Sequence, residues 1–258
     1  MTSRLYHIAF NTFREAVRDR VLYNLVFFAL LMVGSAPLFS TISIGLERIV
    51  LVNLGLTAIT LFGVVIAIFI GIGLVSKEIE KRTLYTVLSR PVRRWEFIVG
   101  KYLGLAATLI VNAGFMALGL FAAVLFVQRS LGMQDTYILI ALYFIVLQFL
   151  VIIAITLLFS SFSSPLLSAI FAFGVFVIGN FADDIRGFAS LTEGVQRWLI
   201  TAVSYMVPNF GSMNVVSQVA HGQGVALGLV AMNTLYAALY LLAALSGAIL
   251  IFEKRNLK

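Results

Sequence analysis

A charged island at residues 75–101 constrains the fold of this chain more than any other feature. The island holds seven of the eighteen Lys and Arg residues and three of the eleven Asp and Glu residues, and long uncharged segments flank it on both sides. Such an island is typical of a loop in water that joins two membrane helices. Composition agrees, since 61% of the 258 residues are hydrophobic and only 11% are charged, whereas a soluble domain has about 25% charged residues. The sequence therefore predicts an all-α polytopic membrane protein.

The apolar segments divide into six predicted spans, which place both termini on one side of the membrane. Fourteen Lys and Arg residues fall on the side of the termini and the charged island, and four fall on the other side. Because cytosolic loops are enriched in Lys and Arg, we expect both termini and the loop 76–97 in the cytosol of a cell whose plasma membrane (in bacteria, the inner membrane) holds the protein. The predicted spans of this single domain, residues 1–258, are approximately 21–39, 53–75, 98–127, 137–159, 166–181 and 224–252.

Two amphipathic segments accompany the spans. Residues 3–20 carry apolar side chains at helical spacing on one side and polar ones on the other, which predicts a helix in the membrane interface, with a plain surface helix as the alternative. The outer segment 182–223 contains a second apolar stripe over residues 191–206, which includes Trp198 and ends before Pro208. This pattern predicts an outer amphipathic helix that lies flat on the outer leaflet or dips into it.

The charged island contains a short predicted helix of its own. Three apolar residues recur at i, i+3 and i+4, so they share one helical face. Pro91 ends this helix, because the residue before a proline is driven out of the α region. The helix of the third span is predicted to begin near Arg93, which would give it about 35 residues and about 52 Å. The apolar residues of the short helix are Leu84, Val87 and Leu88.

The run EKRTLYTVLSRPVRR at residues 80–94 resembles the cytosolic coupling loop of type-2 ABC transporter permeases. The likeness extends to TFREAVRDRVLY near the N-terminus, to SSFSSPLL at 160–167 and to PNF…N…AHG at 208–222, and together these resemble the branch associated with copper-enzyme maturation. The resemblance implies two permease copies, or one copy with a related partner, and two cytosolic ABC ATPase subunits. ATP and Mg²⁺ would be bound by the ATPase, so this chain is expected to hold no cofactor.

The resemblance also implies that the short helix docks on the ATPase. Its apolar face would supply the anchor, while the surrounding charges would set register and orientation. The alternative is that this face lies against the membrane surface without a partner. The predicted ATPase-coupling residues are Glu78, Lys81, Arg82, Thr83, Leu84, Val87, Leu88, Arg90 and Pro91.

The chain lacks the sequence marks of an enzyme. It has no G-x-x-x-x-G-K-[ST] loop for nucleotide phosphates, no cysteine and only two histidines, of which His221 in the outer segment has no ligand-type neighbours in sequence. We therefore expect no catalytic residue and no metal site. The spans have no acidic or basic residue deep inside them, which argues against an ion-coupled carrier. The +7 formal charge reflects membrane topology, so nucleic acid is not an expected partner.

Neutral polar residues inside the spans allow two interpretations. They could form interhelical hydrogen bonds that steady the packing, or they could line a translocation path. The glycine pairs Gly100-x-x-x-Gly104 and Gly224-x-x-x-Gly228 permit close helix approach. The candidate path residues are Asn112, Gln148, Thr156, Asn180 and Asn233.

The sequence thus predicts the permease subunit of an ATP-driven ABC exporter, whose separate ATPase powers movement of a substrate across or out of the membrane. One alternative is a transporter-like complex that does mechanical or assembly work on an extracytoplasmic partner or metalloenzyme without passing a solute. Another is a membrane scaffold or lipid-processing protein without an ATPase. A neutral path disfavours a bare multivalent ion, and it suits a lipid, a hydrophobic peptide and a small sulfur species equally.

Overall fold

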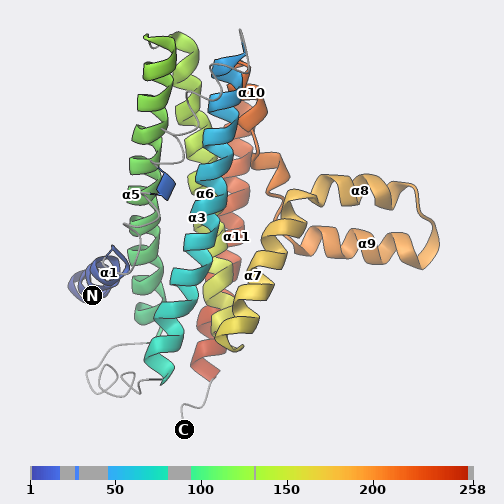
Figure 1. The fold of residues 1–258 in the computed structure, drawn as a ribbon. Coiled ribbons are helices and arrows are strands. Elements are labelled where there is room, and N and C mark those ends of the chain that lie inside the picture. The colour runs from blue at the N-terminus through green and yellow to red at the C-terminus, as the bar shows by residue number, and fades with distance from the viewer. Residues whose placement is uncertain (1, 18–26, 29–45, 81–93, 131, 255–258) are drawn as a thin grey trace.

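A computed structural model describes residues 2–17, 27–28, 46–80, 94–130 and 132–254. These residues form helices joined by short connections and contain no strand, so the predicted all-α class is confirmed. The elements, labelled as in Figure 1, are α1 (Thr2–Ala16), α3 (Glu47–Glu80), α5 (Arg94–Gln128), η2 (Met133–Thr136), α6 (Tyr137–Ser160), α7 (Pro165–Asn180), α8 (Ala182–Ser190), α9 (Gly194–Met206), η3 (Gly211–Met213), α10 (Val216–Ala220) and α11 (Leu227–Lys254).

Helix α6 is the centre of an upright bundle that also contains α3, α5 and α11, with α7 packed along one side (Figure 1). Its sequence YILIALYFIVLQFLVIIAITLLFS is apolar around the whole helix, and most of its residues are buried. A helix that is hydrophobic on every face belongs inside a bundle or a membrane. Helices α3, α5 and α11 carry exposed apolar residues on their outer faces, as expected of helices that contact lipid.

Four helices of the described residues are long and apolar enough to cross a membrane: Glu47–Gly73, Trp95–Gln128, Met133–Ser160 and Leu227–Glu253. A fifth crossing requires α7 and α8 together, which are bent by 60° at Phe181. The first predicted span, 21–39, lies outside the described residues except for Phe27 and Phe28. The six-span topology therefore remains a prediction, of which the described chain contains four or five spans.

The helix ends differ from the predicted span ends where polar residues continue a helix. Helix α3 begins at Glu47 and runs to Glu80, beyond the predicted 53–75 at both ends. Hydropathy locates the apolar part of a helix, whereas the backbone continues as long as its polar residues find partners. Helix α5, in contrast, begins at Arg94, one residue from the predicted start near Arg93, and has 35 residues.

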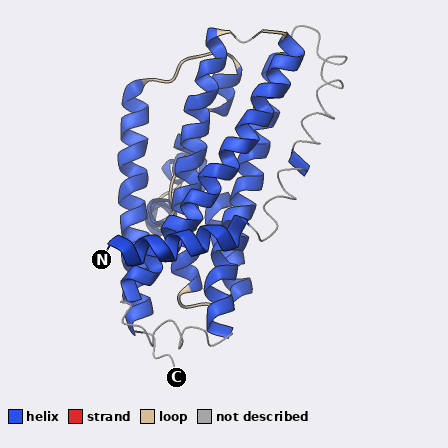
Figure 2. Cartoon of the chain, turned by 90° about the vertical axis from the view of Figure 1, so that its left-hand side faces the viewer, coloured by secondary structure: helices blue, strands red, loops and turns tan. Residues whose placement is uncertain are grey.

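Helix α1 lies across α5, near the end of the bundle where α3 and α11 also end (Figures 1 and 2). Its contact uses the predicted glycine pair on α5. A Cβ on Gly104 would lie 2.5 Å from the carbonyl oxygen of Ala9, and one on Gly100 would lie 2.7 Å from the Ile8 side chain. Only glycine permits this approach. The other pair behaves differently, because nothing described lies within 4 Å of a Cβ on Gly228.

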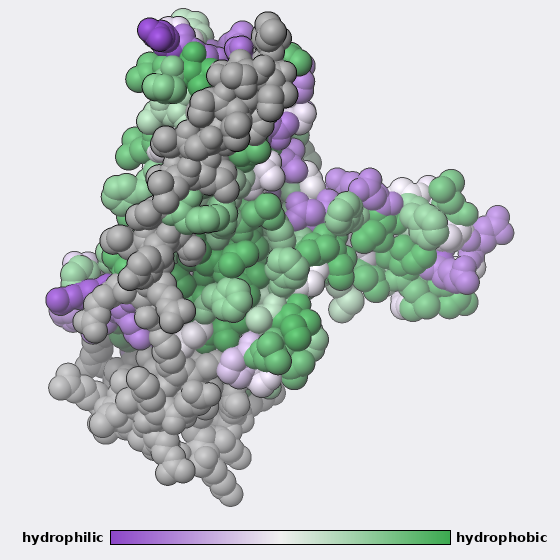
Figure 3. Space-filling model, in the orientation of Figure 1, coloured by the Kyte–Doolittle hydropathy of each residue, from purple (hydrophilic) through white to green (hydrophobic). Residues whose placement is uncertain are grey.

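Helices α8 and α9 form a hairpin that projects sideways from the bundle (Figure 1). The predicted amphipathic helix 191–206 begins three residues later, at Gly194, because Leu191 is the C-cap of α8 and the turn follows it. Trp198 is 71% exposed, and hydrophobic side chains cover much of the hairpin surface (Figure 3). The described helices leave this stripe uncovered, and its predicted contact with the outer leaflet stays a prediction.

The root of the hairpin is held by polar contacts to α11 and to the chain after α9. Asn209 donates to the Asp183 carboxylate at 2.6 Å, and its backbone N–H donates to the Tyr236 hydroxyl at 2.9 Å. Arg186 contacts Asp183 at 3.3 Å and lies over the ring of Tyr205. These contacts fix the direction in which the apolar hairpin leaves the bundle.

Candidate functional site

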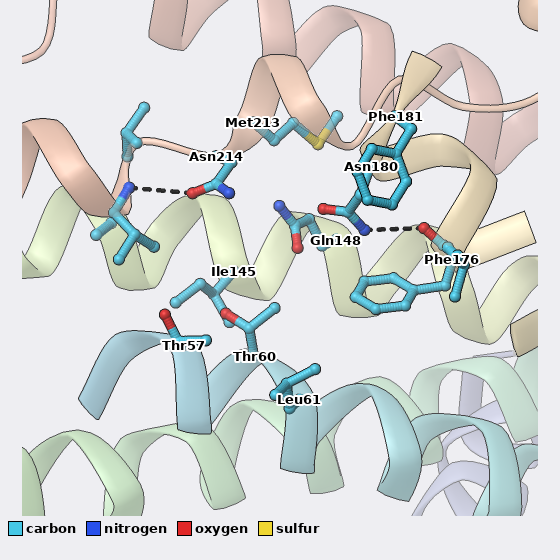
Figure 4. A pocket seen from close by; sticks show the side chains of 14 residues that line it. Thr57, Thr60, Leu61, Ile145, Gln148, Phe176, Asn180, Phe181, Met213 and Asn214 are labelled. Atoms are coloured by element: carbon cyan, nitrogen blue, oxygen red, sulfur yellow. Dashed lines mark hydrogen bonds between the residues drawn. The ribbon is translucent and has the colours of Figure 1, made fainter. Parts of the chain in front are cut away.

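A pocket of about 210 Å³, with five polar residues among fourteen that line it, lies between α3, α6, α7 and the connection 213–216 (Figure 4). Its floor is buried and includes Gln148 and Ile145 of α6 and Phe176 of α7. Its rim is exposed, with Leu61 52% and Val177 39% accessible. The pocket therefore opens sideways between α3 and α7, in the part of the protein that apolar surface surrounds.

Two amide side chains meet in this pocket, and each donates one N–H to a backbone carbonyl. Gln148 is 3% exposed and its Nε2 donates to the Phe210 carbonyl at 3.4 Å. Asn180 Nδ2 donates to the Phe176 carbonyl at 2.8 Å, which leaves its oxygen on the side of Gln148 (Figure 4). Because a carbonyl accepts only from the NH₂ end of an amide, both orientations are determined. The Gln148 Oε1 atom is buried and has no partner among the described residues.

The end of α7 creates the pocket. Helix α7 stops at Asn180, after only sixteen residues or about 24 Å, and the chain after the hairpin returns against it. The Phe210 N–H donates to the Gly179 carbonyl at 2.9 Å. A Cβ on Gly179 would lie 2.4 Å from the Pro208 carbonyl oxygen, so a side chain there would push this returning segment away and change the pocket roof.

The structure brings together two of the five candidate path residues, Gln148 and Asn180, and separates the others. Asn112 on α5 is buried with both polar atoms unpartnered among the described residues, and the buried Thr156 hydroxyl on α6 is also unpartnered there. Asn233 on α11 donates to the Ser212 carbonyl at 2.9 Å and accepts from its hydroxyl at 3.2 Å. Asn233 therefore joins α11 to η3, in agreement with the interpretation of these polar residues as hydrogen-bonding groups between helices.

Three polar residues of the pocket are not among the candidate path residues predicted from the sequence: Thr57 and Thr60 of α3, and Asn214. A threonine in a helix does not indicate a pocket, because its hydroxyl can bond within its own helix. The Thr60 Oγ1 atom does donate to the Leu56 carbonyl at 2.9 Å. Asn214 lies in an irregular connection, where an asparagine is ordinarily a turn residue. His221 of the outer segment contacts the carbonyl of Ser217 in its own turn at 2.8 Å.

The predicted coupling residues lie almost entirely outside the described residues. Glu78 falls within the last turns of α3, and the other eight belong to residues 81–93. What the structure does show is the pair of helices on either side. Helices α3 and α5 pack on each other, and their 34 and 35 residues correspond to about 51 and 52 Å, well beyond the hydrocarbon core of about 30 Å.

Comparison with known protein families matches residues 6–257 to the ABC-2 family transporter proteins. No curated protein matches the chain significantly. The family match covers nearly the whole chain and agrees with the helix bundle, its apolar outer faces and the paired long helices around the charged loop. Members of this family normally work with an ATPase subunit. The chain therefore belongs to the ABC-2 family, and it is a membrane permease component of an ABC transporter.

Proposed function

We propose that this chain is the permease subunit of an ATP-driven exporter and that residues 76–97 couple it to separate cytosolic ATPase subunits. ATP and Mg²⁺ are bound by those subunits, and the permease acts as two copies or as one copy with a related permease. Both termini face the cytosol, and the cargo leaves by way of the pocket between α3, α6 and α7.

The observation that carries this proposal is that one unbroken helix connects the charged loop with the pocket. Helix α3 contributes Thr57, Thr60 and Leu61 to the pocket and continues without a break to Glu80, within the predicted loop 76–97. The twenty residues from Thr60 to Glu80 span about 30 Å of helix. A helix of this kind is stiff, so a displacement of the loop by an ATPase would move the pocket wall directly.

Replacing Leu84 with arginine tests the coupling. Docked apolar anchors commonly lose about 2 kcal/mol on truncation, so we expect roughly thirtyfold weaker association between permease and ATPase. The measurement is co-purification of the ATPase with the permease, together with ATP hydrolysis by the reconstituted complex. Leu88→Arg should have the same effect, since Leu88 shares the predicted face.

A matched control is Thr86→Arg, which adds the same charge to the predicted helix on the side away from Leu84 and Leu88, and it should leave association unchanged. Full retention of ATPase binding and ATP hydrolysis in both leucine variants would refute the coupling assignment.

Labelling of single cysteines tests the orientation, and the chain has no native cysteine to interfere. Because the fourteen-to-four distribution of Lys and Arg puts the termini in the cytosol, an impermeant thiol reagent should label cysteines at Ser43, Gln134 or Glu193 in intact cells. Cysteines at Thr86 or Lys258 should react only after the cells are opened. Labelling of Thr86→Cys from outside would reverse the topology and remove the coupling loop from the cytosol.

A further inference from the structure

We infer that the pocket between α3, α6 and α7 binds an uncharged lipid whose headgroup donates hydrogen bonds from hydroxyl groups, as a monoacylglycerol does. This inference rests on the proposed function, in which cargo passes through this pocket, and it names the chemical class of that cargo. It can be tested on the permease alone, without ATP or an ATPase.

The polar groups of the pocket favour a hydrogen-bond donor. Gln148 and Asn180 each have one amide N–H bound to a backbone carbonyl, which fixes the position of the amide oxygen as an acceptor in the pocket. The Thr60 hydroxyl hydrogen is likewise given to the Leu56 carbonyl, which leaves the oxygen lone pairs. Buried acceptors are costly when unpaired, and Gln148 Oε1 is buried without a described partner. A ligand hydroxyl would satisfy it.

The charge of the pocket excludes an ionic headgroup. None of its fourteen lining residues is charged, and nine of them are apolar. A phosphate or carboxylate placed there would lose its hydration without gaining a cation, which is strongly unfavourable. A bare metal cation would fit poorly for the same reason, because most of the wall offers it no oxygen ligand.

The size and position of the pocket indicate that the rest of the ligand lies outside it. A volume of about 210 Å³ is below the roughly 300–1,000 Å³ of pockets that enclose a drug-sized molecule, so only a small headgroup enters. From the rim, Leu61, Val65 and Phe69 continue along one face of α3 at intervals of four residues, and they are 52%, 40% and 67% exposed. This strip suits an acyl chain.

Binding of three oleoyl lipids to the purified protein separates the alternatives. Native mass spectrometry of the detergent-solubilised permease would be titrated with monooleoylglycerol, with its di-O-methyl ether and with oleoyl lysophosphatidic acid. The ether keeps the oxygens and the chain but donates no hydrogen bond. We expect the ether to bind about tenfold more weakly than monooleoylglycerol, the loss typical of a missing hydrogen bond to a buried group. Oleoyl lysophosphatidic acid keeps a hydroxyl group and should bind at least as weakly as the ether, because its phosphate would lose its hydration without gaining a cation. Equal binding of all three, or no binding of monooleoylglycerol, would overturn the inference.

Two variants locate the binding. Gln148→Leu and the smaller change Thr60→Val should each weaken monooleoylglycerol binding and leave the ether unaffected. The matched control is Asn112→Leu, which removes a buried amide from α5, away from the pocket. Unchanged monooleoylglycerol binding in a folded Thr60→Val and Gln148→Leu would place the lipid elsewhere and overturn the site. Failure of the ATPase experiment with Leu84→Arg would leave this result standing, so the two proposals fail separately.

Discussion

Replacing Asp135 with alanine is expected to lower the apparent unfolding temperature of the purified permease by about 6–12 °C. Asp135 in η2 is 4% exposed at its side chain, and its Oδ1 accepts from Arg48 Nε of α3 at 3.0 Å. Removing one partner of a buried ion pair costs about 3–5 kcal/mol, because the other charge is left buried and uncompensated. A loss of about 3 kcal/mol corresponds to this temperature shift in a chain near this size.

The effect should be large because the pair ties α3, η2 and α10 together. Arg48 also donates to the Ala220 carbonyl at the end of α10 at 2.8 Å, and Asp135 Oδ2 accepts from the Gly132 N–H at 2.7 Å. The same contacts explain why α3 begins before its apolar part, since Arg48 in its first turn is held by partners on η2 and α10. Without Asp135, α3, η2 and α10 would lose their common anchor.

Two further variants make this prediction specific. Asp184→Ala removes an exposed carboxylate from the outer segment and should change the unfolding temperature little. The double variant Arg48→Met with Asp135→Leu replaces the pair by apolar groups and should recover much of the loss, because buried pairs can often be exchanged for hydrophobic residues. If Asp135→Ala unfolds at the same temperature as Asp184→Ala, the anchor has no energetic role. The measurement is the apparent unfolding temperature, monitored by size-exclusion chromatography.

The sequence predicted the apolar helices well because burial in a membrane leaves a strong local pattern. A run such as that of α6 has no polar face, so it can only be a buried or membrane helix. The hairpin shows where the local pattern fails. Helices α8 and α9 are each amphipathic, and the positive φ of Gly194, 67°, lies where the second of them begins. Nothing in the periodicity predicts that α8 follows α7 directly at a 60° bend.

The pocket was predictable only in part, for a different physical reason. Buried amides are unusual in an apolar helix, so Gln148 and Asn180 stand out by residue type alone. Their meeting depends on the length of α7 and on the return of Phe210 to Gly179, both of which are tertiary. In the same way, the sequence singles out Gly100 and Gly104 as a close-contact motif, but it does not reveal that the partner is α1.

Replacing Gly104 with alanine is expected to release helix α1 from α5. The added Cβ would lie 2.5 Å from the Ala9 carbonyl oxygen and 2.6 Å from the Thr12 Cβ, and a backbone atom cannot move aside as a flexible side chain can. Overpacking a tight contact costs up to about 3 kcal/mol. We therefore expect the amides of α1 to exchange with deuterium on the order of a hundredfold faster in the variant. The measurement is hydrogen–deuterium exchange in nanodiscs.

Gly114→Ala is the matched control, because it adds the same methyl group to the same helix where nothing described lies within 4 Å of the new atom. In a helix, alanine is favoured over glycine by about 1 kcal/mol. Helix propensity alone would therefore make both variants at least as stable as the parent protein, whereas contact with α1 makes only Gly104→Ala harmful. The two substitutions change the stability in opposite directions only if α1 packs against Gly104. Equal protection of α1 in both would mean that the helix is held by its apolar face in the membrane interface, independently of α5.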